Sequence, residues 1–390
     1  MKDRRPLDPD SRKRRRAKVV FWALVLALLL LAPSLWLLAQ APAAAIGGRW
    51  VLDFEPDGSL QLELERHGFG HGHFQSSSDY ALGDFRGLSR PSSTTDAAAR
   101  FEMARDAGTI TFEGQLNASG GAGHFSFAGN PEFVSGMKGL GYASLSEEQL
   151  FSMTLHDVSR AFLRDLDSLG YRKLPVDDLI AMRIHGAGPG FIRELQALGY
   201  EHPPVDDLVA MRIHGASAEF IRELKPLGYD RLPADDLVAM RIHGVSPDFI
   251  RDLKSLGYDH LSTDDLVALR IHGASTEFIR GMKSSGYDRL SGEDLVACRI
   301  HGVSPEMVRE LKSLGYEHVP ADQLVAMRIH GVTPEFVGEL QKLGYKGVSV
   351  DELVAMRIHG VTIDFVKRMK AQDKAISIDE MVDMRIHGRS

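Results

Sequence analysis

Three histidines lie close together in the sequence RHGFGHGHF and could bind a metal ion. They are His67, His71 and His73, with His124 further along the chain. Imidazoles at this density bind zinc, nickel or copper. No carboxylate or cysteine completes a recognisable ligand spacing, so the alternative interpretation is a glycine-rich hairpin tip with solvated histidines. We keep His67, His71 and His73 as candidate metal ligands and predict no bound cofactor.

A second group of histidines recurs at a fixed interval. The tetrapeptide RIHG occurs eight times, with its histidines 29 residues apart until a final interval of 28. A degraded copy precedes them at His156. The RIHG histidines are His185, His214, His243, His272, His301, His330, His359 and His387. A bond to zinc spans only about 2 Å, so one histidine per repeat does not predict a metal array. A column of histidines that titrate together near pH ~6.5 stays open as a pH-sensing hypothesis.

Residues that could carry catalysis do not form a recognisable set. The sequence contains no HExxH, GxSxG or P-loop motif, and no GxGxxG in the right strand context. Acidic pairs such as Asp206 and Asp207 recur from repeat to repeat, whereas catalysis needs one special constellation. The single cysteine, Cys298, cannot form an intramolecular disulfide and is predicted to fill a core. We predict that the chain is not an enzyme and has no catalytic residues.

The 29-residue interval predicts nine helical-hairpin repeats over residues 130–388. An aromatic position advances in the same register from Phe133 to Phe365, with Met307 as its one substitution. In the copy from Ser246 to Gly273, Ser246 and Pro247 predict the start of a first helix. A Schellman ending is predicted at Gly257, with Tyr258 folded back on the last turn. Ser262 and the carboxylate of Asp265 predict the start of a second helix.

The two helices of this copy differ in their apolar pattern. Phe249, Ile250 and Leu253 form one stripe, which predicts an outer, amphipathic first helix. The second helix is apolar nearly all round and is predicted to be buried as an inner column. No unit could then bury its apolar surface alone, which predicts an all-α solenoid. Arg270 is expected to bind carbonyls or an aspartate of the adjoining unit, and His272 to bind carbonyls at the helix end.

Residues 47–129 have a different character and predict a small antiparallel β domain. Leu60, Leu62 and Leu64 alternate with polar residues beside a Pro-Asp-Gly turn, which is typical of a hairpin. The same rhythm continues to residue 128 and predicts a meander of about five or six strands, interrupted by an exposed loop over residues 84–99. The whole chain is therefore predicted to be an α+β multidomain protein.

The N-terminal part predicts a membrane anchor. Residues 19–39 carry no charge and are long enough for a transmembrane helix, while residues 1–18 form a basic tail with nine Lys or Arg against three Asp or Glu. The positive-inside rule puts this tail in the cytoplasm and the bulk of the chain outside. The alternative is a cleaved signal peptide, since residues 43–45 are alanines. Either interpretation predicts export. The chain has a net charge of -7, and its part beyond the basic tail is acidic, which argues against nucleic-acid binding.

The repeat sequence resembles that of a known group of bacterial proteins. The phrase LVAMRIHGVTPEF, with LGY before it, and the phrases AGTITFEG and GHFSFAGNPEF are similar to the C-terminal outer segments of metallopeptidase antirepressors of the beta-lactam-sensor type and of anchored relatives. The resemblance covers about residues 47–388. It implies a bacterial envelope location and a sensing context. The peptidase domain with its HExxH helix is absent, so neither protease activity nor its zinc is implied.

These observations predict a single-pass protein of the bacterial inner membrane that acts as a protein-binding or sensory scaffold. Its partner is an unidentified envelope protein, and the membrane contact is made through residues 19–39. The alternative is an envelope ligand- or metal-binding protein with a site in the β domain. Charged positions on the first helix of each repeat are the candidate partner-binding row, or else a solvated face. This arginine row consists of Arg193, Arg222, Arg251, Arg280 and Arg309.

Overall fold

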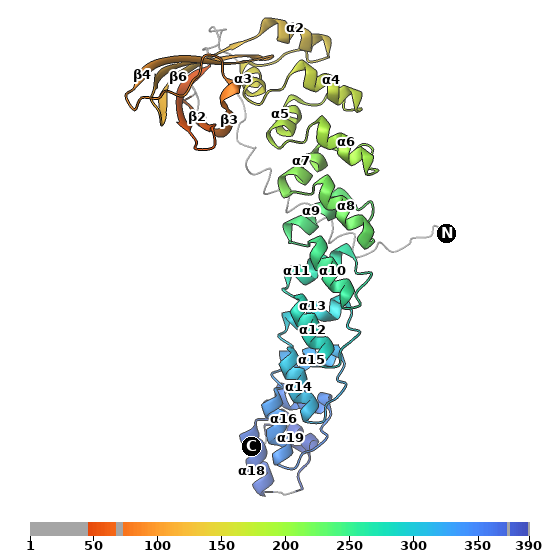
Figure 1. The fold of residues 1–390 in the computed structure, drawn as a ribbon. Coiled ribbons are helices and arrows are strands. Elements are labelled where there is room, and N and C mark those ends of the chain that lie inside the picture. The colour runs from red at the N-terminus through yellow and green to blue at the C-terminus, as the bar shows by residue number, and fades with distance from the viewer. Residues whose placement is uncertain (1–45, 68–72, 373–374, 389–390) are drawn as a thin grey trace, which may run out of the picture. The chain divides into compact units, whose positions relative to one another are not determined.

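The computed structural model describes residues 46–67, 73–372 and 375–388. The predicted basic tail (residues 1–18) and transmembrane helix (residues 19–39) lie outside this part. Within it, no helix combines the length and the apolarity needed to cross a bilayer. The described chain is α+β, with a six-stranded antiparallel sheet followed by 18 α-helices in a repeat-like region (Figure 1).

The sheet is built from six strands in the order β3-β2-β1-β6-β5-β4. Their bounds are β1 (Gly47–Phe54), β2 (Ser59–His67), β3 (His73–Ala81), β4 (Ala97–Arg105), β5 (Gly108–Leu116) and β6 (Gly120–Gly129). The first and last strands pair at the centre, with Arg49 opposite His124. The sheet is therefore two three-stranded meanders side by side, and the prediction of a single meander is wrong in this respect. The predicted loop over 84–99 extends too far, because β4 begins at Ala97.

One face of the sheet forms the apolar core. The alternating residues Leu60, Leu62 and Leu64 of β2 are each at most 1% exposed, as the period of two predicts. The connection from β3 to β4 contains a short 3-10 helix (Leu82–Asp84) and covers this face with Phe85. Phe85 makes an edge contact with Phe101, at 5.8 Å between ring centroids.

Trp50 lies across neighbouring strands because two of them carry glycine at that point. Trp50 pairs with Gly123, and Gly123 with Gly114. A Cβ on Gly114 would lie 2.8 Å from the Trp50 ring, so only glycine leaves room for the indole. The ring Nε1–H then donates to the Glu113 and His124 carbonyls at 3.2 and 3.1 Å. The indole is buried with its polar group satisfied.

The helices alternate between two classes, which we call A helices and B helices. The A helices are α2 (Pro131–Gly139), α4 (Arg160–Ser168), α6 (Pro189–Ala197), α8 (Ala218–Leu224), α10 (Pro247–Ser255), α12 (Thr276–Ser284), α14 (Pro305–Ser313), α16 (Pro334–Lys342) and α18 (Ile363–Gln372). The B helices are α3 (Glu147–Leu155), α5 (Val176–Ile184), α7 (Val205–His214), α9 (Ala234–Ile242), α11 (Thr263–Ile271), α13 (Gly292–Ile300), α15 (Ala321–Ile329), α17 (Val350–Ile358) and α19 (Ile378–Ile386). A second 3-10 helix (Lys225–Leu227) follows α8.

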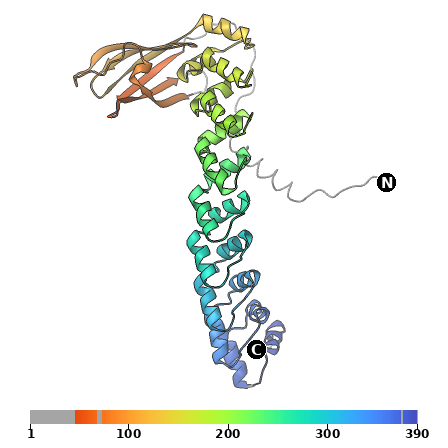
Figure 2. The same cartoon turned by 45° about the vertical axis from the view of Figure 1, so that its right-hand side comes forward.

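Helices of one class contact the same class in the next repeat. Thus α9 contacts α11, which contacts α13, and α10 contacts α12, which contacts α14. The helices thus form two rows that run side by side through the repeat region (Figure 2). In most repeats a tyrosine hydroxyl donates a hydrogen bond to a carbonyl of the next repeat. Tyr229, for example, donates to the Leu261 carbonyl at 2.8 Å. Tyr258 is the exception among the described residues, since its buried hydroxyl has no hydrogen-bond partner.

The predicted helix starts and ends are confirmed in the copy from Ser246 to Gly273. The Ser246 hydroxyl accepts the Phe249 N–H at 3.2 Å, and Ser262 forms a capping box with Asp265. At the end of α10, the Tyr258 N–H binds the Leu253 carbonyl at 3.0 Å, as a Schellman ending requires.

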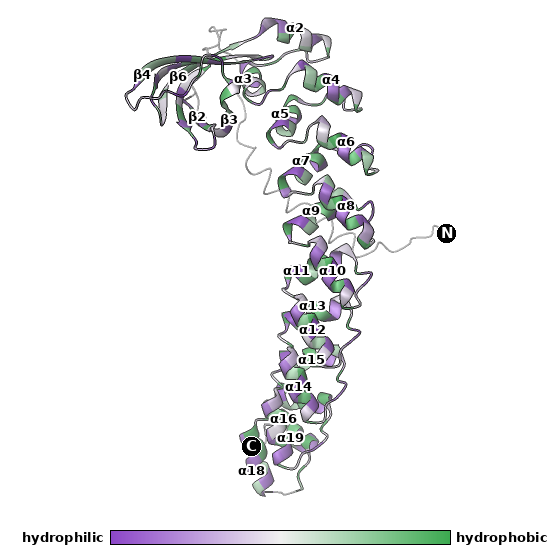
Figure 3. Ribbon diagram, in the orientation of Figure 1, coloured by the Kyte–Doolittle hydropathy of each residue, from purple (hydrophilic) through white to green (hydrophobic). Residues whose placement is uncertain are grey.

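The predicted division into outer A helices and buried inner B helices is wrong. Helix α10 buries Phe249, Ile250 and Leu253, whereas α11 buries only Leu266 and Leu269. Both classes carry hydrophilic residues as well as hydrophobic ones (Figure 3). Apolar residues around most of a helix show that several faces could be buried, but not which face has a neighbour. In the B helices after α3, one apolar face has no neighbour.

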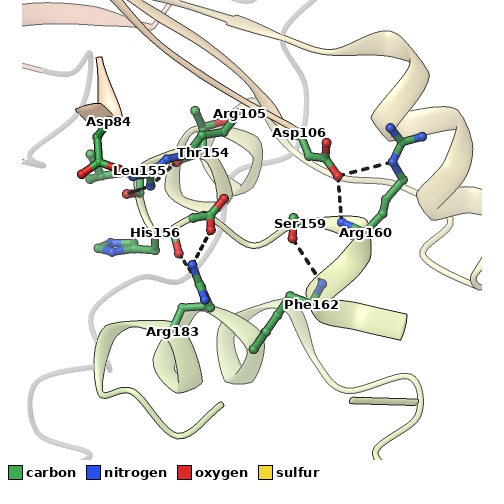
Figure 4. Close-up of polar contacts among 11 residues, drawn as sticks. Asp84, Arg105, Asp106, Thr154, Leu155, His156, Ser159, Arg160, Phe162 and Arg183 are labelled. Carbon is green, nitrogen blue, oxygen red and sulfur yellow. Dashed lines mark hydrogen bonds and ion pairs between the residues drawn. The ribbon is translucent and has the colours of Figure 1, made fainter. Parts of the chain in front are cut away.

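The sheet and the first two repeats are joined by polar contacts at the end of β4. Asp106 accepts the Arg160 backbone N–H at 3.0 Å, which ties the turn after β4 to the start of α4 (Figure 4). Asn130 caps α2 and also donates to the Asp106 carbonyl at 3.0 Å. These contacts tie the first and second repeats to the sheet.

Candidate binding surface

Each B helix from α5 onward ends abruptly, and its last isoleucine stays exposed. In α11 the Gly273 N–H binds the Arg270 carbonyl at 3.2 Å and the Ala274 N–H binds the Leu269 carbonyl at 2.8 Å. This reversal needs the left-handed φ of +68° that Gly273 adopts. The chain therefore turns away at once and nothing follows to cover Ile271, which is 53% exposed.

The exposed isoleucines recur on one helix face in eight repeats. In α11 the outer face carries Asp264, Val267, Ala268 and Ile271, at the spacing that places residues on one side of a helix. Val267 and Ala268 are half-buried. Since neighbouring B helices contact each other, these faces adjoin. We call the exposed isoleucines the isoleucine strip: Ile184, Ile213, Ile242, Ile271, Ile300, Ile329, Ile358 and Ile386, each 46–55% exposed.

Acidic residues border the strip at the other end of each B helix. They lie in the first helical turn, where carboxylates complement the helix dipole. All are exposed. We call them the acidic row: Asp177, Asp206, Asp235, Asp264, Glu293, Asp322, Asp351 and Asp379. The outer face of a B helix is therefore acidic at its start and apolar towards its end.

The RIHG arginines, most of which are exposed, contact the preceding repeat. The Arg212 Nε–H donates to the His185 carbonyl at 3.3 Å, and its guanidinium lies 5.3 Å from the Phe191 ring centroid. Arg183 binds the His156 carbonyl at 2.9 Å and also pairs with Asp157. The predicted contact with a carbonyl or aspartate of the adjoining unit is confirmed at these positions. Arg270, for which it was predicted, is exposed and contacts the Phe249 ring instead. Cation–ring contacts recur at Arg241, Arg270, Arg299, Arg357 and Arg385.

The repeat histidines do not bind the helix ends as predicted. Except for the half-buried His214, the RIHG histidines are exposed. Among the described residues, His387 alone makes a ring hydrogen bond to such a carbonyl, from Nδ1 to the Asp383 oxygen at 3.0 Å. The backbone turn and the arginine of the next repeat occupy the helix end instead. In the first repeat, burial lowers the pKa of His156, helped by Arg105 and Arg183.

The predicted arginine row lies exposed on the A helices. Two of its members are partly neutralised, because Arg251 pairs with Asp248 and Arg309 with Glu306, each within its own helix. Exposed pairs of this kind add little stability. The row is exposed and carries mixed charge.

The candidate metal ligands of the β domain are only partly described. Strand register places His67 opposite His73 across β2 and β3, while His71 lies outside the described residues. His124 is exposed on β6, opposite Glu113 of β5. Within the described ranges, no group of three or more His, Cys, Asp and Glu side chains could hold a metal ion.

Cys298 lies in the core of α13, as its position in the repeat predicts. Its side chain is buried, and this burial raises the pKa of the thiol to about 11. A thiol that stays protonated at neutral pH is a poor nucleophile.

Sequence reasoning missed the isoleucine strip. The signal was present, because an acid, a valine, an alanine and an isoleucine recur at positions of one helix face. The apolar residues of this face were assigned to the core, together with the leucine and methionine that do lie there.

Comparison with known proteins adds no identification. No protein-family model matches the chain, and the search of curated proteins gives no match.

Proposed function

We propose that the chain is a membrane-anchored, non-enzymatic scaffold of the bacterial cell envelope that binds protein through its helical repeats. In this proposal residues 19–39 anchor it in the inner membrane with the N-terminus in the cytoplasm. The nine 29-residue hairpins act as a solenoid outside the cytoplasm and recruit an envelope protein.

The isoleucine strip is the observation that carries this proposal. Single exposed apolar residues are ordinary on a protein surface, whereas a contiguous exposed patch marks an interaction site. Eight isoleucines at the same helical position, each about half exposed, form such a patch on adjoining helices. Repeat proteins bind extended partners through surfaces of this kind.

The proposal is tested in the full-length chain by replacing four strip residues, Ile213, Ile242, Ile271 and Ile300, with Gln. These side chains are exposed, so the variant is expected to fold. In-cell crosslinking is expected to lose the captured envelope protein. The matched control replaces Arg193, Arg222, Arg251 and Arg280 with Gln and is expected to retain it. Unchanged capture by both variants would show that neither surface recruits the partner.

A further inference from the structure

The first repeat shows what covers the outer face of a B helix. Phe151 and Leu155 of α3 occupy the positions of Val267 and Ile271 in α11, four repeats later. Instead of being exposed, Phe151 is 1% and Leu155 2% exposed. The chain's own sheet covers them, with the Phe151 ring stacked on Phe125 of β6 at 5.7 Å between centroids. The same helix face is thus an occupied interface in one repeat and an open face in the eight that follow.

A charge pair accompanies this apolar contact. Glu148 of α3 holds the position of Asp264, a member of the acidic row. Arg66 of β2 donates to both Glu148 carboxylate oxygens, at 2.6 and 2.7 Å. This hydrogen bonding lowers the pKa of Glu148. The Arg66 guanidinium also lies 5.8 Å from the Phe151 ring centroid. The sheet therefore recognises the acid and the apolar residue together.

A second arginine of the sheet binds the other end of α3. The Arg105 guanidinium donates to the Thr154 carbonyl at 3.1 Å and to the Leu155 carbonyl at 2.7 Å (Figure 4). A cation is favoured there because the last helical turn is the negative end of the helix dipole. The contact as a whole consists of apolar strand residues between two basic residues, one at each end of the helix.

The spacing of the elements allows this contact to continue along the repeats. The backbone of helix α3 lies closest to two strands, β5 and β6, while Arg66 of β2 and Phe74 of β3 reach the helix through their side chains. Helix α3 also contacts α5, where the isoleucine strip begins. Two strands together span about 9.5 Å, close to the 8–10 Å that separates the axes of packed helices. A sheet that placed two strands on each B helix would therefore match the spacing of the repeats.

We infer that the B helices from α5 to α19 bind a partner as α3 binds the chain's own sheet: the partner presents an apolar β-sheet face bordered by Lys or Arg. This inference rests on the proposed function and adds the chemistry of the partner. The exposed carboxylates of the acidic row disfavour an anionic lipid surface. The chain's own sheet face is already covered by α3, so a second copy could supply it only by exchanging its sheet.

The experiment places a photocrosslinking amino acid at Ile271 or Ile300 of the full-length chain in its membrane, and at Arg251 as a control site. Crosslinked residues in the partner are then mapped by mass spectrometry. We expect crosslinks from positions 271 and 300 on strand residues with Lys or Arg nearby. A combined Asp264→Lys and Glu293→Lys variant is expected to lower their yield about tenfold. A combined Asp259→Lys and Asp288→Lys variant, an equal charge change at two exposed acids outside the acidic row, is expected to leave the yield unchanged.

Several outcomes would overturn the inference and remain distinct from failure of the proposed function. Crosslinks to helical segments, to phospholipid, or to the strands of a second copy would refute the stated partner. Crosslinks from position 251 alone would move binding to the arginine row, so protein binding would stand without the sheet contact. Equal loss of yield in the combined Asp259→Lys and Asp288→Lys variant would remove the charge specificity. An absence of crosslinks from all three positions would refute the proposed function as well.

Discussion

Helices α3 and α11 hold the same place in two repeats, yet one has its outer face buried and the other has it open. Both begin with a serine cap and both bury a leucine and an apolar residue three positions on, Leu150 and Met153 in α3. They differ in what lies beyond the helix. A sheet covers α3, and its face carries the larger Phe151 where α11 has Val267. The comparison teaches that the face is suited to an apolar partner, and that the repeat itself does not supply one.

The largest expected effect distinguishes the two outer faces directly. Phe151→Ala removes a fully buried ring and is expected to lower the local free energy of unfolding by about 3–5 kcal/mol. Val267→Ala, at the equivalent half-buried position, is expected to cost less than about 1 kcal/mol. Amide hydrogen exchange in β5, β6 and α11 of the full chain measures both. Similar losses at the two positions would contradict the difference between the repeats.

A second pair of variants tests the open face within α11. Leu269→Ala is expected to cost about 2–5 kcal/mol because Leu269 is 0% exposed. Ile271→Ala, two residues on, is expected to cost below about 1 kcal/mol because half of its surface is already in water. The readout is the exchange protection of the α11 amides. An equally costly Ile271→Ala would mean that the strip is covered in the isolated protein.

Loss of the tyrosine contact between repeats is expected to have a smaller effect on the free energy of unfolding. This contact anchors α11 to the preceding repeat. It has no counterpart for α3, because no repeat precedes α3. Tyr229→Phe removes the hydrogen bond to the Leu261 carbonyl and is expected to cost about 1 kcal/mol. Tyr258→Phe is the matched control, because the Tyr258 hydroxyl has no partner to lose. Urea unfolding of the two variants measures the difference, and an equal loss would show that the hydroxyl contact contributes nothing.

The smallest expected effect concerns pH. Burial lowers the pKa of His156 below its ordinary 6.5, so the folded state holds the proton less tightly than the unfolded chain. Above pH 6.5 the His156 ring is neutral and the free energy of unfolding is at its full value. As the pH drops below 6.5, the free energy of unfolding falls. His156→Gln is expected to flatten the fall in melting temperature between pH 8 and 5. His272→Gln, at an exposed position, serves as the control; a slope unchanged by His156→Gln would contradict the effect.

Local signals account for much of the helical region. Caps such as Ser262 with Asp265 act within one turn, and Gly273 needs only its own backbone freedom to end a helix. The repeat interval and the arginine contact with the adjoining unit also followed from the residues. Strand β3 was not predicted, because its run of serines has no apolar alternation and its pairing with β2 is a tertiary contact.

The sequence by itself therefore determined the repeat, its helix boundaries and the residues available for packing. Only the tertiary structure decided which apolar residues were covered, because a helix with several apolar faces does not reveal which face meets a neighbour. The pairing of β1 with β6, the sheet on Phe151 and the open strip at Ile271 all depend on such neighbours. Burial is a property of two surfaces, and the residues at one position specify only one of them.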